Sequence, residues 1–297
     1  MATALPPECE RGARRRLALR ARDDDITRIV ARRRSGWFEY ARELVRFRDL
    51  LLYFVLRDVR VRYSQTVLGF GWSVLQPFLQ MVVFSIFFGG LAGISSGDVP
   101  YPVFSLAAVV PWIYFLNGVS ASSISLISNA QLIGKVYFPR LLVPLAPLGA
   151  GIVDLAIALG LLFGVMAVYG IFPPLWGLLV LPLLVVLVVL AAAGFSIWLA
   201  ALGALYRDVR YVTPFFLQTL LFVTPIIYVV ESVPESVRPF YSINPLVGVV
   251  GGFRSALLGQ GPLPVDSLMT SAIVSITLIV AGLWYFRGVE RAMADVA

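Results

Sequence analysis

Long apolar segments, separated by short polar or proline-rich breaks, occupy most of the chain beyond about residue 67. Several of these segments exceed the roughly 20 residues that a helix needs to cross about 30 Å of hydrocarbon. They predict six spans, at about residues 69–92, 101–128, 141–169, 175–205, 212–230 and 267–286. The expected fold is an all-α polytopic membrane protein, with residues 67–297 forming a six-span transmembrane domain.

Residues 37–66 follow a different pattern, in which charged and apolar positions alternate at three- and four-residue steps. The charged or polar positions are Arg42, Arg46, Asp49, Tyr53, Arg57 and Arg60, and the opposing apolar stripe is Leu44, Phe47, Leu51, Phe54 and Val55. This period predicts an amphipathic helix. Its longest apolar run, 50–56, is too short to span a bilayer, so the helix is expected to lie along the cytoplasmic interface. The alternative is a helix packed within a soluble N-terminal domain.

Proline and glycine punctuate residues 231–264, although the sequence between them stays apolar. An irregular backbone at membrane depth is tolerated only where protein or water covers it. The segment therefore predicts short re-entrant helices that dip into the outer leaflet before the last span.

Charge predicts the orientation of these spans. The 297 residues carry a net charge of +7, are 59% hydrophobic and have a mean hydropathy of +0.86. Lys135, Arg140, Arg207 and Arg210 lie between spans where the positive-inside rule requires a cytoplasmic side, and Arg287 keeps the C-terminus there. Both termini are expected in the cytoplasm. The exceptions are two arginines in the outward segment, Arg238 and Arg254.

Residues 1–36 form a basic, arginine-rich tail that is expected to be disordered and cytoplasmic. Such a tail either acts as a retention signal or binds anionic lipid or nucleic acid. The retention signal is the favoured interpretation, and no nucleic acid partner is expected.

The composition excludes several kinds of chemistry. The chain has no histidine, and Cys9 is its one cysteine, so histidine-based catalytic triads and multi-cysteine metal sites are absent. The nearest approach to a phosphate-binding loop is Gly134-Lys135, which is followed by Val136 rather than Ser or Thr. We therefore expect no enzyme activity, no metal and no cofactor in this chain.

Asp154 is the one acid inside a predicted span. An ionisable residue in a membrane is a functional-site hypothesis by default, and the alternative is a hydrogen bond between helices.

The stretch 132–140 holds the one lysine of the chain in a short turn between two predicted spans. We interpret it as a cytoplasmic knob that another protein contacts. Aromatic residues cluster near the predicted interfaces, where they form the usual aromatic belt. A minority is predicted to line an internal path in which rings stack on sugar faces: Phe84, Phe87, Phe88, Phe115 and Tyr228.

Three stretches of residues 37–290 resemble the membrane subunit of type-2 ABC exporters of polysaccharide and polyol phosphate, including O-antigen, teichoic acid and capsule exporters. They are 57–72 (RDVRVRYSQTVLGFGW), 129–144 containing Val136-Tyr137-Phe138-Pro139-Arg140, and Pro225-Ile226-Ile227-Tyr228 followed by Asn244-Pro245-Leu246 and Gly252-Phe253-Arg254. The second stretch resembles the family's cytoplasmic coupling helix, at about 129–141.

This resemblance implies a homodimer in a bacterial cytoplasmic (inner) membrane, bound to two copies of a separate ATPase that holds ATP and Mg. The implied cargo is a glycan on a polyprenyl diphosphate, often undecaprenyl diphosphate, and membrane lipids are further partners. The residues that would contact the ATPase are Lys135, Tyr137, Phe138, Arg140, Arg57 and Arg60. Arg62, Leu68 and Gly69 would lie at the cargo's entry, where basic side chains meet the diphosphate.

Three alternatives remain open from the residues alone. The first is an ABC exporter of a drug or small lipid, which shares the six-span layout. The second is a proton-coupled secondary carrier that uses Asp154. The third is an integral membrane glycosyltransferase, for which Asp98 and Asp266 are the outer acidic residues.

Overall fold

The computed structural model describes residues 36–64, 69–230, 233–234 and 236–296, and the regular elements of these residues are all helices. They are α2 (Trp37–Arg46), α3 (Arg48–Tyr63), α4 (Gly71–Phe84) with its π-helical continuation η1 (Ser85–Leu91), α5 (Tyr101–Ser128), α6 (Ala130–Ile133), α7 (Leu142–Val168), α8 (Leu175–Leu205), α9 (Val209–Val223), α10 (Arg238–Tyr241), α11 (Pro245–Leu258) and α12 (Val265–Val296). The all-α prediction is confirmed. The predicted tail at 1–36 and Leu68 lie outside the described residues, apart from Gly36.

The predicted interface helix at 37–66 is two helices, interrupted at Phe47. α2 belongs to one compact unit, which ends at Arg46, and a second unit begins at Phe47. The predicted apolar stripe agrees with the burial of these side chains, since Phe54 is buried and Leu44, Phe47, Leu51 and Val55 are partly buried. The apolar residues Leu52 and Leu56, outside the stripe, are exposed.

Five helices are long and apolar enough to cross a membrane: Gly71–Leu91, Tyr101–Ser128, Leu142–Val168, Leu175–Leu205 and Val265–Glu290. Each corresponds to a predicted span. The remaining predicted span, 212–230, corresponds to α9, whose 15 residues rise only about 22 Å. The structure thus confirms a polytopic membrane protein, while the count of six spans stays a prediction.

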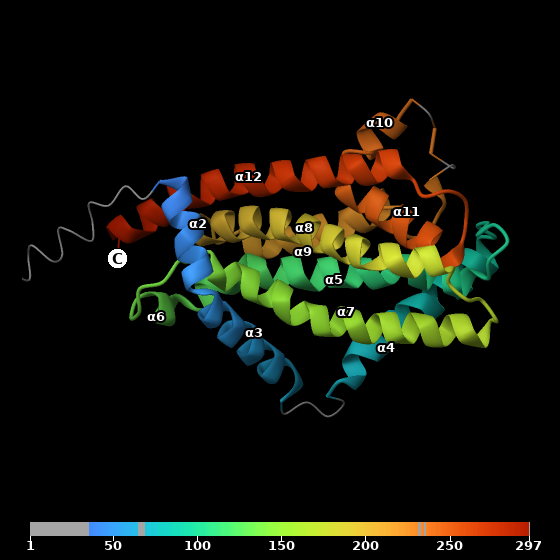
Figure 1. Ribbon diagram of the computed structural model, residues 1–297, viewed down its shortest axis with the longest axis horizontal. Helices are drawn as coiled ribbons and strands as arrows, with labels where there is room; N and C mark the ends of the chain where they lie inside the picture. Colours follow the sequence, from blue (N-terminus) through green and yellow to red (C-terminus); the bar gives the residue numbers. More distant parts are fainter. Residues whose placement is uncertain (1–35, 65–68, 231–232, 235, 297) are drawn as a thin grey trace, which may run out of the picture. The chain divides into compact units, whose positions relative to one another are not determined.

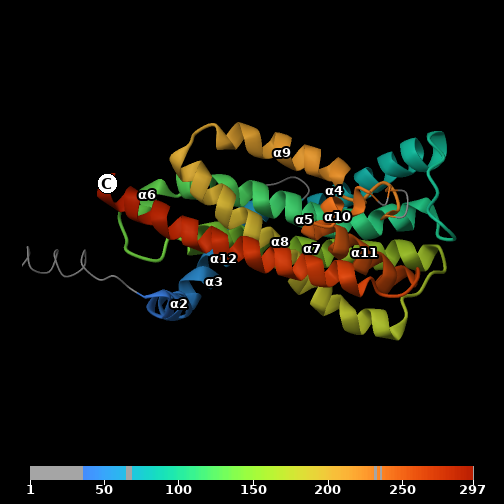
Figure 2. The ribbon, with the colours of Figure 1, turned by 90° about the horizontal axis from the view of Figure 1, so that it is seen from above.

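Helix α5 is the centre of the second unit, since it packs on both α7 and α8 and lies between them in Figure 1, while Figure 2 shows α9 alongside it. Nearly its whole length is buried within this chain, from Tyr101 to Leu126. A helix that is apolar all round needs neighbours on every side, and α4, α7, α8, α9 and α11 all pack on α5. α12 covers the far side of α8.

The punctuated segment before the last span contains α10 and α11, and the ends of α11 follow from its sequence. Asn244 caps its N-terminus by accepting a hydrogen bond from the backbone N–H of Leu246 at 3.0 Å, and Pro245 takes the first helical position. Gly259 ends it in the left-handed conformation at φ 66°. At 14 residues, α11 is too short to span, which agrees with the short helices predicted there.

Arg254 of α11 explains one exception to the charge rule, because it is buried inside the protein rather than exposed on the outer face. Its Nη1 donates to the carbonyl of Pro225 at 2.7 Å, and its Nη2 donates to the carbonyl of Ile226 at 2.8 Å. Its guanidinium also lies over the Phe104 ring, 3.5 Å from the centroid. The chain leaves helical geometry after Val223, so these carbonyls lack helical partners and Arg254 satisfies them.

We expect Arg254→Met to lower the free energy of unfolding by at least about 2 kcal/mol, because several carbonyls would be left buried and unpaired. Arg254→Lys should recover only part of this loss, since an ammonium lacks the planar fork that reaches two carbonyls at once. Thermal unfolding of the purified protein in detergent measures the effect. Arg207→Met, at an exposed arginine, is the control. Equal stability of Arg254→Met and Arg207→Met would contradict the assigned role.

Candidate functional site

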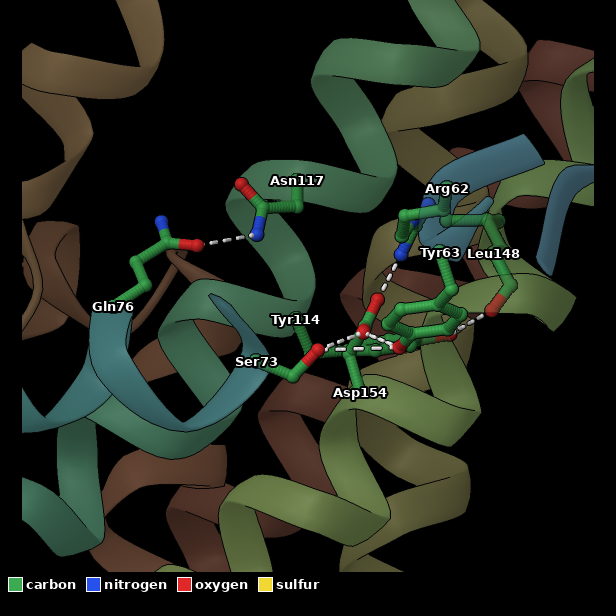
Figure 3. Close-up of polar contacts among 8 residues, drawn as sticks. All are labelled: Arg62, Tyr63, Ser73, Gln76, Tyr114, Asn117, Leu148 and Asp154. Carbon is green, nitrogen blue, oxygen red and sulfur yellow. Dashed lines mark hydrogen bonds and ion pairs between the residues drawn. The ribbon is translucent and has the colours of Figure 1, made fainter. Parts of the chain in front are cut away.

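Helix α3 packs closely along α7, and glycine makes this approach possible. A Cβ atom added to Gly149 of α7 would lie 2.6 Å from Cγ2 of Val55 on α3. The lack of a side chain at Gly149 therefore lets the two helices meet. The packing brings the last residues of α3, Arg62 and Tyr63, beside α7 (Figure 3).

A cavity of about 340 Å³ lies where the end of α3 meets α4, α5 and α7. Its polar lining comes from all four helices and includes Arg62, Ser73, Gln76, Asn117 and Asp154 (Figure 3). The Asn117 side chain donates across the cavity to Oε1 of Gln76 at 3.2 Å. Cavities near this size hold small ligands or head groups rather than polymers.

Asp154 is the acceptor on which the polar groups of this cavity converge. Arg62 Nη1 forms an ion pair with its Oδ2, and the Tyr63 hydroxyl donates to its Oδ1. The Ser73 hydroxyl donates to the same Oδ1 at 2.6 Å, and the Tyr63 and Ser73 oxygens lie 3.1 Å apart. The carboxylate thus binds α3 and α4 to α7. Three donors, one of them cationic, compensate a charge placed in an apolar helix.

The structure brings together several of the predicted site residues. Arg62 and Gly69, predicted at the cargo entry, both line the cavity with Asp154, while Leu68 lies outside the described residues. Asp154 makes the bond between helices that was the alternative to a functional role. Sequence reasoning missed Tyr63 and Ser73. The sequence signal for these two residues is weak, because a tyrosine or serine hydroxyl can be assigned to a site only when the carboxylate that it contacts is known.

The predicted coupling segment at 129–141 contains one helical turn, α6, followed by an irregular stretch. α3 holds this segment at two places. Arg57 Nη1 donates to Oδ1 of Asn129 at 2.9 Å, and the Phe54 ring packs edge-on against Phe138 with centroids 5.6 Å apart. Phe138 is only 5% exposed, so it anchors the segment to α3 within this chain.

The remaining residues predicted to contact an ATPase differ in exposure. Tyr137 is 74% exposed, and Lys135 and Arg60 are also exposed. Arg140 is partly buried, and Glu290 of α12 accepts a hydrogen bond from the backbone N–H of Arg140 at 3.2 Å. The segment is thus bound at one end by α3 and at the other by α12, with Lys135 and Tyr137 on the surface between.

The predicted path aromatics do not share one environment. Phe115 is fully buried in the core against Phe195, and Phe84 is buried beside Phe88. Phe87 is exposed on η1. The Tyr228 hydroxyl donates to the carbonyl of Phe222 at 3.0 Å, in the segment that follows α9. The described residues therefore do not form a continuous aromatic lining within one chain.

A double-mutant cycle tests the ion pair that holds the cavity together. We expect Arg62→Met and Asp154→Leu each to lower the free energy of unfolding by about 1–3 kcal/mol, because each leaves a partly buried charge unpaired. The double variant should lose less than the sum of the two, by about 1–2 kcal/mol. Thermal unfolding in detergent measures the cycle. Arg48→Met, an exposed arginine on the same helix, is the control partner for Asp154→Leu and should be additive with it. Additive losses for Arg62 and Asp154 would contradict the interaction.

Comparison with known proteins identifies the family. A model of the ABC-2 type transporter family matches residues 50–258, which is more than half of the chain. Similar proteins include two O-antigen export system permease proteins named RfbA. The one from Klebsiella pneumoniae is 28% identical over 251 residues, covering 84% of this chain and 95% of that protein. The one from Myxococcus xanthus is 27% identical over 258 residues, covering 86% and 97%. The polysialic acid transport protein KpsM of Escherichia coli is 26% identical over 250 residues, covering 80% and 92%. Together with the five long apolar helices, the family match shows that this chain is a multi-pass membrane protein of the ABC-2 type transporter family.

Proposed function

We propose that this chain is the permease subunit of an ATP-driven exporter that carries polysaccharide across a bacterial cytoplasmic membrane. The observation that carries the proposal is its similarity, over nearly their full length, to relatives named for O-antigen export and polysialic acid transport. These names favour a glycan cargo over a drug or a small lipid. The family match also favours transport over the glycosyltransferase alternative.

The energy for transport comes from a separate ATPase that binds ATP and Mg, since residues 134–136 lack the Ser or Thr of a nucleotide-binding loop. Two ATPase copies bind beneath a homodimer of this chain, with both termini in the cytoplasm. The surface that the ATPase contacts is the segment between α6 and α7. Lys135 and Tyr137 offer exposed side chains there, and Phe138 supports them from inside.

The cargo is a glycan on a polyprenyl diphosphate, which enters beside the cavity at the end of α3. Arg62 and Gly69 line that cavity. Closure of the ATPase pair moves the coupling segment. Because α3 contacts both that segment and the cavity, the movement reaches the entry.

Export is tested in cells by depleting this chain. We expect polyprenyl-linked glycan to accumulate on the cytoplasmic side and to disappear from the surface, and re-expression should restore export only when the partner ATPase hydrolyses ATP. Surface glycan is measured by immunoblotting and the lipid-linked precursor by mass spectrometry. Export that survives ATPase inactivation but fails when the proton gradient is collapsed would identify a secondary carrier instead. The proposal would also be refuted if depletion left the surface glycan unchanged and caused another lipid to accumulate on the cytoplasmic side.

Alanine variants of the coupling segment distinguish a residue that contacts the ATPase directly from residues that only support the segment from inside. Tyr137→Ala should reduce co-purification of the ATPase at least about tenfold, because an exposed aromatic at an interface contributes strongly to binding. Phe138→Ala and Phe54→Ala should weaken association to the same extent as each other, because both remove one internal contact. They should also destabilise the protein by about 3–5 kcal/mol.

The matched control is Tyr169→Ala, at an exposed tyrosine of the turn between α7 and α8. It should leave ATPase association unchanged. Retention of the ATPase by Tyr137→Ala would show that this segment is not the docking surface.

A further inference from the structure

The groups that surround Asp154 make up an anion-binding site that the chain fills with its own carboxylate. The donors are the guanidinium of Arg62 and the hydroxyls of Tyr63 and Ser73, and they come from two different helices. A carboxylate and a phosphate are both acceptor-only anions, and arginine binds either with the same fork of N–H groups. The site would therefore accept a phosphate group with the same donors.

The position of the pair makes a merely structural role costly. Asp154 lies 12 residues after Leu142, the first residue of α7, which is about 18 Å along a helix of about 40 Å. A charged pair at this height pays a desolvation penalty, and apolar side chains of similar volume often stabilise such a position equally well. The side chains remain accessible, at 30% exposure for Arg62 and 16% for Asp154. An exchange of partners at Arg62 is therefore possible without unpacking the helices.

The walls of the cavity indicate what would accompany the phosphate. Trp72, 54% exposed, lines the cavity at the start of α4, and the amides of Gln76 and Asn117 lie on another side. Aromatic faces and amide groups suit a sugar ring, and an ordinary phospholipid head group needs neither. Beyond Trp72, the α4 surface carries exposed Phe78 and Leu79, which suit an acyl or isoprenyl chain.

We propose that Asp154 holds this cavity closed by occupying the position of an anionic ligand group, the diphosphate of an isoprenyl-linked sugar, until that ligand displaces it. This proposal rests on the proposed function, because it takes the head group of that cargo as the ligand. The ion pair keeps Arg62 neutralised in the empty protein. On binding, Arg62, Tyr63 and Ser73 pass from the carboxylate to the phosphate oxygens. No covalent bond changes.

The proposal predicts that removing the competing charge strengthens binding. In nanodiscs of phosphatidylcholine, the full chain with its ATPase is titrated with radiolabelled farnesyl diphosphate. Asp154→Asn should bind it about tenfold more tightly than the unmodified protein, and Arg62→Gln should bind it about tenfold more weakly. Farnesol, which lacks the diphosphate, should bind equally weakly to all of them. Asp208→Asn, at an exposed acid outside the cavity, is the control for the loss of one negative charge.

The outcomes separate the possibilities. Tighter binding by Asp154→Asn alone supports the site, and unchanged or weaker binding overturns it. If Asp154→Asn proves unstable, the charge-retaining Arg62→Lys must still bind better than Arg62→Gln, and equal binding overturns the site. Competition by phosphatidylglycerol as strong as that by unlabelled farnesyl diphosphate supports an anion site but assigns it to bulk phospholipid.

Failure of glycan export in cells would refute the proposed function without altering these ratios of binding affinity. Normal export with no gain in Asp154→Asn would refute this inference alone.

Discussion

Charge that enters hydrocarbon must be matched by groups of the protein itself, and this constraint organises both polar centres of the bundle. At one end of the molecule, the Arg254 guanidinium binds carbonyls that a broken helix leaves unpaired. In the cavity, Asp154 receives donors from α3 and α4. Water would otherwise satisfy these groups, and its exclusion makes each unmatched charge cost several kcal/mol. The chain therefore uses its few buried charges to fix the places where helices end or cross.

Helix α3 connects the cavity to the coupling segment, because it contacts both. Its middle residues hold the coupling segment through Phe54 and Arg57, and its last residues hold Asp154 through Arg62 and Tyr63. Arg57 and Arg62 are five residues apart, about 7.5 Å along one helix. Under the proposed function, a displacement of the coupling segment would reach the cavity without an intervening hinge, because both anchors belong to the continuous helix α3.

The sequence predicts the helices far better than it predicts the contacts between them. Apolar length places five spans to within a few residues, since the bilayer imposes that length. It fails at α9, where the run 212–230 stays apolar but the helix ends at Val223. Pro225 is the local cause, because a proline disfavours helical geometry at the residue before it, and Thr224 is extended. The distant Arg254 satisfies the carbonyls of Pro225 and Ile226 that the break leaves unpaired, and this compensation has no local sequence signal.

For the candidate site too, the sequence identifies single residues but not the contacts between them. Asp154 and Arg62 stand out in the sequence because they are charges in or near apolar segments, yet nothing in their spacing, 92 residues apart, pairs them. Phe138 belongs to a motif that suggested external docking, but its burial against Phe54 gives it an internal role. The exposure of a side chain depends on how the whole chain packs, so it cannot be predicted from the position of a residue in a motif.

The contacts of Asp154 also bear on the choice between an ATP-driven permease and a proton-coupled carrier. A carboxylate that carries protons must exchange with water on each side of the membrane in turn, and its neighbours must tolerate both of its charge states. Here an arginine and two hydroxyls bind it together, so protonation would release Arg62 as an unpaired charge beside the apolar helices. A free phosphate group compensates that release, whereas a proton does not. The geometry therefore favours exchange of one anion for another at Arg62 over proton exchange at Asp154, in keeping with energy supplied from outside this chain.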